Sequence, residues 1–247
     1  MKFDYRFGNQ YFNYYDKKGV KSTVYDILAP EQEQKEQPGK EYLMNPLPIF
    51  DNPNYKGSGK LKGKVAIITG GDSGLGRAAA IAFTKEGASL VIPYYNEHED
   101  ALYTKEYIEK LGGTCLLLSG DITKKSFSEE IITKTLETFG KIDILVNNAG
   151  VQYQQDTLDK ISDEQFDWTM KVNVYGMFYL TKAILPYLKS GASIINLSSI
   201  TTFYGEPQLI DYVTTKGAIV GFTRALARNL ALKNIRVNAI APGFFWT

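Results

Sequence analysis

Cysteine, histidine and long apolar runs are almost absent from this 247-residue chain. Its one cysteine, Cys115, cannot form an internal disulfide, so we expect a reducing, cytoplasmic location. Its one histidine, His98 in "NEHEDA", has no second histidine with which to share a metal, so we expect a surface residue and no metal site. No stretch approaches the roughly 20 apolar residues of a membrane span, and the start "MKFDYRFGNQYFNYYDKKG" lacks the apolar core of a secretory signal.

An excess of charge of either sign is missing too. The chain has 28 Lys and Arg residues against 27 Asp and Glu residues, a formal net charge of +1 at pH 7. This balance gives no reason to expect nucleic acid or an anionic membrane as a partner. The hydrophobic share of 44% is ordinary for a globular protein, and the length suits one α/β domain.

The first part of the chain, residues 1–62, shows no sustained helical or strand periodicity. We interpret it as an extended N-terminal arm that is partly disordered, most clearly in the charged, glutamine-rich segment from Glu31 to Glu41. The next segment, Tyr42 to Tyr55, carries apolar residues among its prolines, so we expect it to lie against a folded surface, which could belong to a neighbouring subunit. An aromatic cluster could form a third contact: Tyr11, Phe12, Tyr14 and Tyr15.

Residues 63–247 alternate apolar strands with helices and are expected to form one domain. The predicted strands lie in "KVAIIT", "SLVIPY", "TCLLLSG", "DILVNNAG", "ASIINLSS" and "IRVNAIAPG". Helices are predicted between them, including one long helix from about Asp163 to Lys189. Continuous apolar strands that alternate with helices predict an α/β fold, a doubly wound parallel sheet with helices on both faces.

A glycine-rich turn separates the first predicted strand from the first predicted helix. In "IITGGDSGLGRAAAIAF" the glycines fall at positions 70, 74 and 76. Gly70 permits a tight turn, Gly74 lets the backbone approach a phosphate, and Gly76 lets the helix pack against the strand. The helix N-terminus then offers free amides and a positive dipole end to a pyrophosphate. A purely structural turn is the alternative.

A tyrosine and a lysine stand four residues apart in "IDYVTTKGAIVGF", so Tyr212 and Lys216 share one face of a predicted helix. Taken alone, the pair is typical of a solvated helix face. A free tyrosine has a pKa of about 10 and is a poor base near neutral pH. Because a nearby ammonium favours phenolate, we expect Lys216 to lower the pKa of Tyr212.

Three motifs occur in the order that one family uses: the glycines G-x-x-x-G-x-G, "NNAG" at 147–150 and "YVTTK" at 212–216. On these motifs the chain resembles the short-chain dehydrogenase/reductase family from about Lys62 to its last residue. The arm's "QPGKEYLMNPLP" before "GSGKLKGK" is similar to a bacterial subgroup, general stress protein 39-like or glucose/ribitol dehydrogenase-like. The resemblance implies a Rossmann sheet and an oxidoreductase that uses NAD or NADP.

The family's catalytic residues can be carried over position by position. Its serine lies thirteen residues before the active tyrosine, which selects Ser199 over Ser198. The resemblance implies a tetrad of Asn173, Ser199, Tyr212 and Lys216. In that tetrad the tyrosine is the general acid or base, the serine holds the substrate oxygen, and the lysine also contacts the nicotinamide ribose. The asparagine would fix a water in a proton relay.

The resemblance also implies a coenzyme site around these residues. Asp121 would contact adenine, although a helix cap at Asp121 or Thr123 is an alternative that could coexist with it. Asn147 would tie neighbouring strands together, and Ile122 would pack on adenine. The expected coenzyme-binding residues, besides Tyr212 and Lys216, are Gly70, Asp72, Ser73, Gly74, Leu75, Gly76, Tyr94, Asp121, Ile122, Asn148, Ala149, Gly150, Pro242, Gly243 and Thr247.

The choice between NAD and NADP stays open at this point. An acidic residue at the end of the second strand would favour NAD, but that position is Tyr94. Asp72 and Ser73 stand where a basic residue would favour NADP, so the balance leans slightly to NAD. Arg77, one turn into the first helix, could serve either coenzyme.

The family's chains continue beyond the "PG" motif with a substrate-covering segment and a seventh strand, whereas this sequence ends at Thr247. We therefore expect a truncated chain that lacks the C-terminal strand. The remaining substrate wall could be formed by Gln152, Tyr153, Tyr204, Glu206 and Gln208, whose polarity suggests a hydroxylated substrate.

These observations favour an oxidoreductase that interconverts a small alcohol or polyol and its carbonyl compound. The alternative is a dinucleotide-binding or interaction module without turnover. A methyltransferase on a similar sheet has no use for Tyr212 and Lys216 at this spacing. By resemblance we expect a homo-oligomer, a tetramer in full-length relatives, with the helices at 163–189 and 209–232 between subunits.

Overall fold

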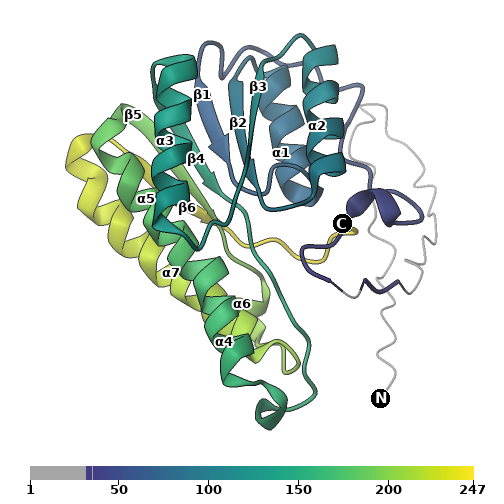
Figure 1. The fold of residues 1–247 in the computed structure, drawn as a ribbon. Helices are drawn as coiled ribbons and strands as arrows, with labels where there is room; N and C mark the ends of the chain where they lie inside the picture. The colour runs from purple at the N-terminus through teal and green to yellow at the C-terminus, as the bar shows by residue number, and fades with distance from the viewer. Residues whose placement is uncertain (1–31, 35) are drawn as a thin grey trace, which may run out of the picture.

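The computed structural model describes residues 32–34 and 36–247. The aromatic cluster predicted to make a contact, Tyr11 to Tyr15, lies outside them. Figure 1 shows a single layer of strands with helices on both sides, and the end of the chain lies beside a short helix of the arm. Among the described residues, no helix combines the length and the apolar character that a membrane crossing would require.

In the described part of the chain, six parallel strands form the sheet, in the order β3-β2-β1-β4-β5-β6. The predicted doubly wound α/β fold is therefore confirmed, because the strand order reverses direction between β1 and β4. The strands are β1 Val65–Ile68, β2 Ser89–Tyr94, β3 Cys115–Ser119, β4 Ile142–Asn147, β5 Leu188–Leu197 and β6 Arg236–Ile240.

The strands are apolar throughout because both faces of the sheet are covered. Ile67 of β1 packs into the core on one face, with side chains of α3, α5 and α7. Its neighbours Ala66 and Ile68 pack into the core on the other face, with side chains of α1 and α2. All three β1 side chains are fully buried, as expected from the two-residue repeat of a strand.

The helices alternate with the strands along the chain (Figure 1). The α-helices are α1 Gly74–Lys85, α2 His98–Lys110, α3 Lys125–Phe139, α4 Asp163–Met170, α5 Met177–Ile184, α6 Thr201–Tyr204 and α7 Ile210–Leu230. Short 3₁₀ turns are η1 Glu41–Leu43, η2 Leu158–Lys160, η4 Leu185–Tyr187 and η5 Ala231–Lys233, and η3 Lys171–Gly176 is a π-helical segment.

The prediction of one regular helix from Asp163 to Lys189 is wrong in two respects. A π-helical segment, η3, separates α4 from α5. The helical stretch also ends earlier, because the 3₁₀ turn that contains Pro186 leads directly into β5 at Leu188. Proline tightens and ends such a turn since it has no amide hydrogen to continue the ladder. The π segment coincides with Asn173, a candidate site residue.

The described part of the arm lies on α1 and α2 of the same chain. Phe50 packs edge-on against Tyr107, with ring centroids 5.1 Å apart. Asp51 forms an ion pair of 2.5 Å with Lys85 at the end of α1. The carboxylate of Glu86 accepts hydrogen bonds from the Tyr55 hydroxyl and from backbone amides of residues 58 and 60. These bonds lower the pKa of Glu86 to about 2, with the Tyr55 hydroxyl as the largest cause.

Candidate active site

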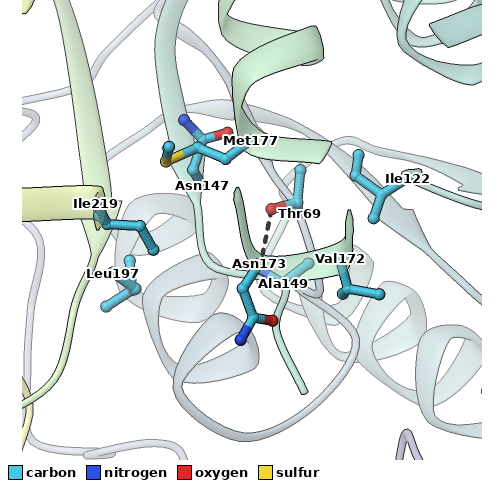
Figure 2. Close-up of a pocket in the computed structure, with 9 residues that line it drawn as sticks. All are labelled: Thr69, Ile122, Asn147, Ala149, Val172, Asn173, Met177, Leu197 and Ile219. Atoms are coloured by element: carbon cyan, nitrogen blue, oxygen red, sulfur yellow. Dashed lines mark hydrogen bonds between the residues drawn. The ribbon is translucent and has the colours of Figure 1, made fainter. Parts of the chain in front are cut away.

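The predicted site residues gather at the carboxyl edge of the sheet, on both sides of the point where the strand order reverses. The glycine loop follows β1, the Asn148–Gly150 turn follows β4, and Ser198 and Ser199 follow β5. Ligands of doubly wound sheets bind at such a point. Figure 2 shows a small pocket here, lined by Thr69, Ile122, Asn147, Ala149, Val172, Asn173, Met177, Leu197 and Ile219.

The glycine loop has the geometry that was predicted from its spacing. Gly70 and Gly74 have positive φ angles of 61° and 50°, which glycine adopts without strain. A Cβ added to Gly76 would stand 1.9 Å from the carbonyl oxygen of Gly70. Only glycine therefore lets the first turn of α1 pack this closely on the end of β1.

The turn after β4 supports the glycine loop from behind. The side-chain amide of Asn148 donates hydrogen bonds of 2.9 Å to the carbonyl oxygens of both Thr69 and Gly70. The Thr69 hydroxyl accepts from the backbone amides of Asn148 and Ala149, the latter bond drawn in Figure 2. The side chain of Asn148, expected to bind coenzyme, thus holds the loop in shape.

Asn147 ties three elements together, as its sequence context suggested. Its amide nitrogen donates to Asn196 of β5 at 2.8 Å and to Thr181 of α5 at 3.0 Å. Asn196 in turn donates to Thr223 of α7 at 2.9 Å. This chain of bonds fixes the carboxyl ends of two strands relative to two helices.

Asn173 lies in the π-helical segment and is almost completely buried. Its side chain pairs with the backbone of Val151, accepting from the amide at 2.8 Å and donating to the carbonyl at 2.9 Å. It also donates to the Thr215 hydroxyl on α7 at 3.1 Å. A Cβ on Gly150 would lie 3.2 Å from its Oδ1 and 3.6 Å from Lys216 Nζ. Asn173 therefore joins the turn after β4 to the helix that carries the tyrosine and the lysine.

Tyr212 and Lys216 face the same point, as the helical spacing predicted. The Nζ of Lys216 lies 5.3 Å from the centroid of the Tyr212 ring and donates a 2.8 Å hydrogen bond to the carbonyl oxygen of Leu197. Lys216 is only 4% exposed, and burial lowers its pKa to about 8. Burial also raises the pKa of the Tyr212 phenol, an effect that a hydrogen bond with Ser199 opposes. The expected downward shift of the Tyr212 pKa is therefore wrong for this structure, because burial outweighs the favourable contacts.

The two neighbouring serines have different roles, and Ser199 is the one beside the tyrosine. Besides its bond with Tyr212, its Oγ accepts from the Thr201 hydroxyl at 2.8 Å and from the Thr201 amide at 3.2 Å. Ser198 donates instead to the carbonyl oxygen of Lys216 at 3.0 Å. Ser198 thus ties β5 to α7, and the choice of Ser199 from its spacing agrees with this geometry.

Asp211, in the first turn of α7, is a site residue that the sequence did not single out. Its carboxylate is fully buried and accepts hydrogen bonds from the backbone amide of Tyr212, from Gln165 and from the Thr169 hydroxyl. The last two belong to α4, so Asp211 fixes the start of α7 against that helix. An acidic residue in the first turn of a helix was the only available signal.

Arg77, which was expected to be able to serve either coenzyme, is engaged in bonds inside the protein. It is 3% exposed, and its guanidinium pairs with the carboxylates of Glu41 and Asp100. Its Nε donates to the carbonyl oxygen of Asp72 and to the Thr104 hydroxyl. Glu41 is also buried and begins η1, so the extended segment expected up to Glu41 ends before this residue.

Asp72 and Glu97 are buried acids beside this ion pair. Burial raises the pKa of Asp72 to about 7, and the charges of Glu97 and Asp100 contribute to the rise. Tyr94 ends β2, as predicted, and its hydroxyl makes a 2.9 Å hydrogen bond with His98, which is exposed. The region between the glycine loop and the end of β2 therefore carries an excess of acidic groups.

Asp121 does not cap the helix that follows it. Helix α3 begins at Lys125, after Lys124. The Asp121 carboxylate accepts from the backbone amide of Thr123 at 2.9 Å and closes a turn within the loop. The proposed cap at Asp121 or Thr123 is thus wrong, since the helix starts too late for either. Ile122 lines the pocket of Figure 2, and its side chain would be 3.0 Å from a Cβ on Gly176.

The C-terminal segment crosses the same edge of the sheet. The carbonyl oxygen of Pro242 accepts from the amide of Ile200 at 2.9 Å. Further on, Trp246 Nε1 donates to the carbonyl oxygen of Pro46 in the arm at 2.8 Å. The Thr247 side chain would stand 3.1 Å from a Cβ on Gly74. Thr247 therefore lies against the glycine loop.

Three of the five candidate substrate residues form hydrogen bonds with neighbouring segments of the chain. The Tyr153 hydroxyl accepts from Trp168 at 3.2 Å, and Gln208 donates to Asp156 at 3.2 Å. Gln152 bonds through its backbone to Gln37 of the arm. Tyr204 is 52% exposed. Their role as a substrate wall stays a prediction.

The geometry of the glycine loop fits a nicotinamide dinucleotide. The first turn of α1 has amides without intrahelical acceptors, two glycines permit close approach of a pyrophosphate, and Thr247 faces the same loop. Across the described residues, no group of three or more His, Cys, Asp and Glu side chains has the arrangement of a metal site.

Comparison with known proteins also points to a dinucleotide-dependent dehydrogenase. Residues 64–247 match the family model described as short chain dehydrogenase. The chain is 52% identical to general stress protein 39 of Bacillus subtilis over 223 residues, which is 90% of this chain and 78% of that protein. It is 40% identical to the glucose and ribitol dehydrogenase of Daucus carota over 224 residues, 88% of this chain and 77% of that protein. The crystal structure of a short chain dehydrogenase from Burkholderia cenocepacia in complex with NADP is similar, with a TM-score of 0.72, 32% identity and coverage of 74% of this chain and 75% of that one.

Proposed function

Because this chain belongs to the short-chain dehydrogenase family and is an oxidoreductase with a nicotinamide dinucleotide coenzyme, we propose that it interconverts a small alcohol or polyol and its carbonyl compound, with Tyr212 as general acid and base. The single observation that carries this assignment is the position of Lys216 Nζ over the Tyr212 ring, beside Ser199. Hydride transfer is the chemistry that the nicotinamide supplies when bound.

In the reduction direction, the Tyr212 hydroxyl donates its proton to the substrate carbonyl oxygen, and the Ser199 hydroxyl donates a hydrogen bond to the same oxygen. Tyr212 keeps its proton at neutral pH because burial raises its pKa. In the oxidation direction the phenol must first lose this proton, so we expect alcohol oxidation to speed up as pH rises.

Lys216 assists Tyr212 as a buried cation that titrates near the working range. Its pKa of about 8 means that it is mostly protonated at pH 7. In that form it stabilises a developing phenolate, and above pH 8 it can take up a proton. The Asn173 contacts with Val151 and Thr215 support a role in holding this part of α7 against the turn after β4.

For the coenzyme, we propose a preference for NAD over NADP. A 2′-phosphate would add negative charge to a region that already holds the buried acids Asp72, Glu97 and Asp100. The guanidinium of Arg77 already forms ion pairs with Glu41 and Asp100, so it is not available to bind that phosphate. Titration calorimetry with both coenzymes tests this preference. A tighter dissociation constant for NADP would contradict it.

The enzymatic assignment is tested by turnover. Purified protein is assayed at the absorbance band of the reduced nicotinamide against a panel of polyols and aldehydes. We expect activity with at least one hydroxylated substrate. Coenzyme binding without any turnover across the panel would instead favour a dinucleotide-binding module.

A further inference from the structure

A short segment of the arm, Gln37 to Pro46, contacts three walls of the candidate site. At its start, the Gln37 side-chain amide donates to the carbonyl oxygen of Gln152 at 2.7 Å, and the amide of Gln152 donates back at 3.3 Å. At its end, the carbonyl oxygen of Pro46 accepts from Trp246 at 2.8 Å. The first contact lies after β4 and the last lies in the C-terminal segment, so this part of the arm joins two segments that follow strands of the sheet. Figure 1 shows the arm beside the end of the chain.

Glu41, between these contacts, reaches the glycine loop itself. One carboxylate oxygen accepts a hydrogen bond of 2.5 Å from the backbone amide of Gly74, the first residue of α1. The other oxygen pairs with the guanidinium of Arg77, one turn further along the helix. Glu41 is 4% exposed. Burial raises its pKa, and the Gly74 amide and Arg77 oppose this shift.

The position of the Glu41 backbone is fixed as well. The amides of Glu41 and Tyr42 both donate to the carboxylate of Asp100 on α2, at 2.8 and 3.2 Å. Asp100 is itself buried and pairs with Arg77 at 3.1 Å. The η1 turn is thus held between two helices by charged hydrogen bonds in a dry environment, where such bonds are strong and the loss of one partner is costly.

The guanidinium of Arg77 is enclosed by aromatic rings from the arm and from α2. Its Cζ lies 5.3 Å from the centroid of Phe50 and 5.1 Å from that of Tyr103. Cation–π contacts of this kind favour the charged guanidinium. Arg77 is therefore held in place as the counter-ion of Glu41. Its charge lets the Glu41 carboxylate approach the N-terminus of α1, where an anion could bind.

From these contacts we infer that the arm segment Gln37–Pro46 is a structural part of the coenzyme site, and that Glu41 is a positioning residue that holds the glycine loop ready for the pyrophosphate. The inference rests on the proposed function. Glu41 takes the Gly74 amide, which leaves the next amides of the same first turn, those of Leu75 and Gly76, to face a phosphate. Four of the seven residues from Gly70 to Gly76 are glycine, whose backbone is conformationally free, so the loop benefits from such an external support.

Two substitutions at Glu41 test the inference, with one matched control. Glu41→Gln keeps the shape of the side chain and removes its charge, and Glu41→Asp keeps the charge and shortens the reach. Glu36→Gln makes the same charge change at an exposed position of the same arm. Folding of each variant is checked by urea unfolding. The measured quantities are the dissociation constant for NAD and for NADP by calorimetry, and kcat and the coenzyme KM.

We expect Glu41→Gln to raise the coenzyme dissociation constant and KM about fivefold or more, with kcat changed less than about twofold. Glu41→Asp should restore part of the affinity, and Glu36→Gln should behave as wild type. An unchanged coenzyme dissociation constant in folded Glu41→Gln overturns the inference. A smaller dissociation constant also overturns it, because it would show that Glu41 competes with the pyrophosphate. If the wild type binds neither coenzyme, the proposed function fails and the inference fails with it.

Discussion

The Nζ of Lys216 donates a 2.8 Å hydrogen bond to the carbonyl oxygen of Leu197, the last residue of β5. This bond links Lys216 of α7 to the carboxyl edge of the sheet. It also holds the amine over the Tyr212 ring. The same burial that fixes the amine lowers its pKa to about 8 and raises that of the phenol. The two groups therefore titrate further apart than they would in water, with the amine losing its proton at a lower pH than the phenol does.

Removing the phenol hydroxyl isolates the acid–base step. Tyr212→Phe is expected to lower kcat by roughly 10²- to 10⁴-fold, because no other hydroxyl in this position could donate the proton as well. The coenzyme dissociation constant should change less than about threefold. Tyr187→Phe, at a 46% exposed tyrosine before β5, is the matched control and should leave both unchanged. Turnover by Tyr212→Phe at the wild-type rate would show that another group is the acid.

Substitution of Asp211 tests how the start of α7 is held. Asp211→Asn places an amide group against the donors Gln165 and Thr169, where the carboxylate accepts both. We expect the free energy of unfolding to fall by about 1–3 kcal/mol. Because Tyr212 is the next residue, kcat should fall while the coenzyme KM is kept.

Asp163→Asn makes the same change at an exposed residue of α4 and serves as the control for Asp211→Asn. Urea unfolding and steady-state kinetics measure both effects. Equal behaviour of the two variants would mean that Asp211 does not position the tyrosine.

Two glycine-to-alanine changes separate close packing from helix propensity. In Gly76→Ala the new Cβ would meet the Gly70 carbonyl oxygen at 1.9 Å, so the loop must shift. We expect a loss of roughly 1–3 kcal/mol in stability and a large loss of coenzyme affinity. In Gly221→Ala, on α7, no described atom outside the adjoining residues and helix backbone lies within 4 Å of the new Cβ, and the protein should gain about 0.5–1 kcal/mol. Calorimetry measures the coenzyme affinity of both variants, and thermal unfolding measures their stability. Normal coenzyme binding by Gly76→Ala would contradict the assigned loop geometry.

The buried acid Asp72 predicts a pH dependence of stability. Burial raises its pKa from 3.8 to about 7 in the folded protein, so the folded state binds the proton more tightly than the unfolded state. Its stabilising contribution is full below about pH 4 and is lost as pH rises to about 7. Asp72→Asn cannot titrate, so relative to this variant the wild type should lose up to about 4 kcal/mol between pH 4 and pH 7. Urea unfolding across this range measures the difference, and parallel curves for the two proteins would contradict a raised pKa.

Local patterns predicted the glycine turn and the shared helix face of Tyr212 and Lys216, because such patterns act over short distances along the chain. Gly70 and Gly76 were predicted from the constraints of one turn, and their φ angle and close contact agree. Tyr212 and Lys216 share a face because they are one helical turn apart. The prediction of one long helix missed the π-helical segment that contains Asn173. The bonds of Asn173 to Val151 and Thr215 join residues distant in the chain, which no local periodicity encodes.

The sequence by itself determined the alternation of strands and helices along the chain, the conformation of the glycine loop and the shared helix face of Tyr212 and Lys216. Only the tertiary structure decided the direction of the Tyr212 pKa shift and the partner of Arg77. Both depend on burial, and burial comes from residues distant in the chain: Glu41 lies 36 positions before Arg77, and the two meet only when the arm folds over α1 and α2. Charge and spacing are visible in a sequence, whereas the solvent that a group loses on folding is not.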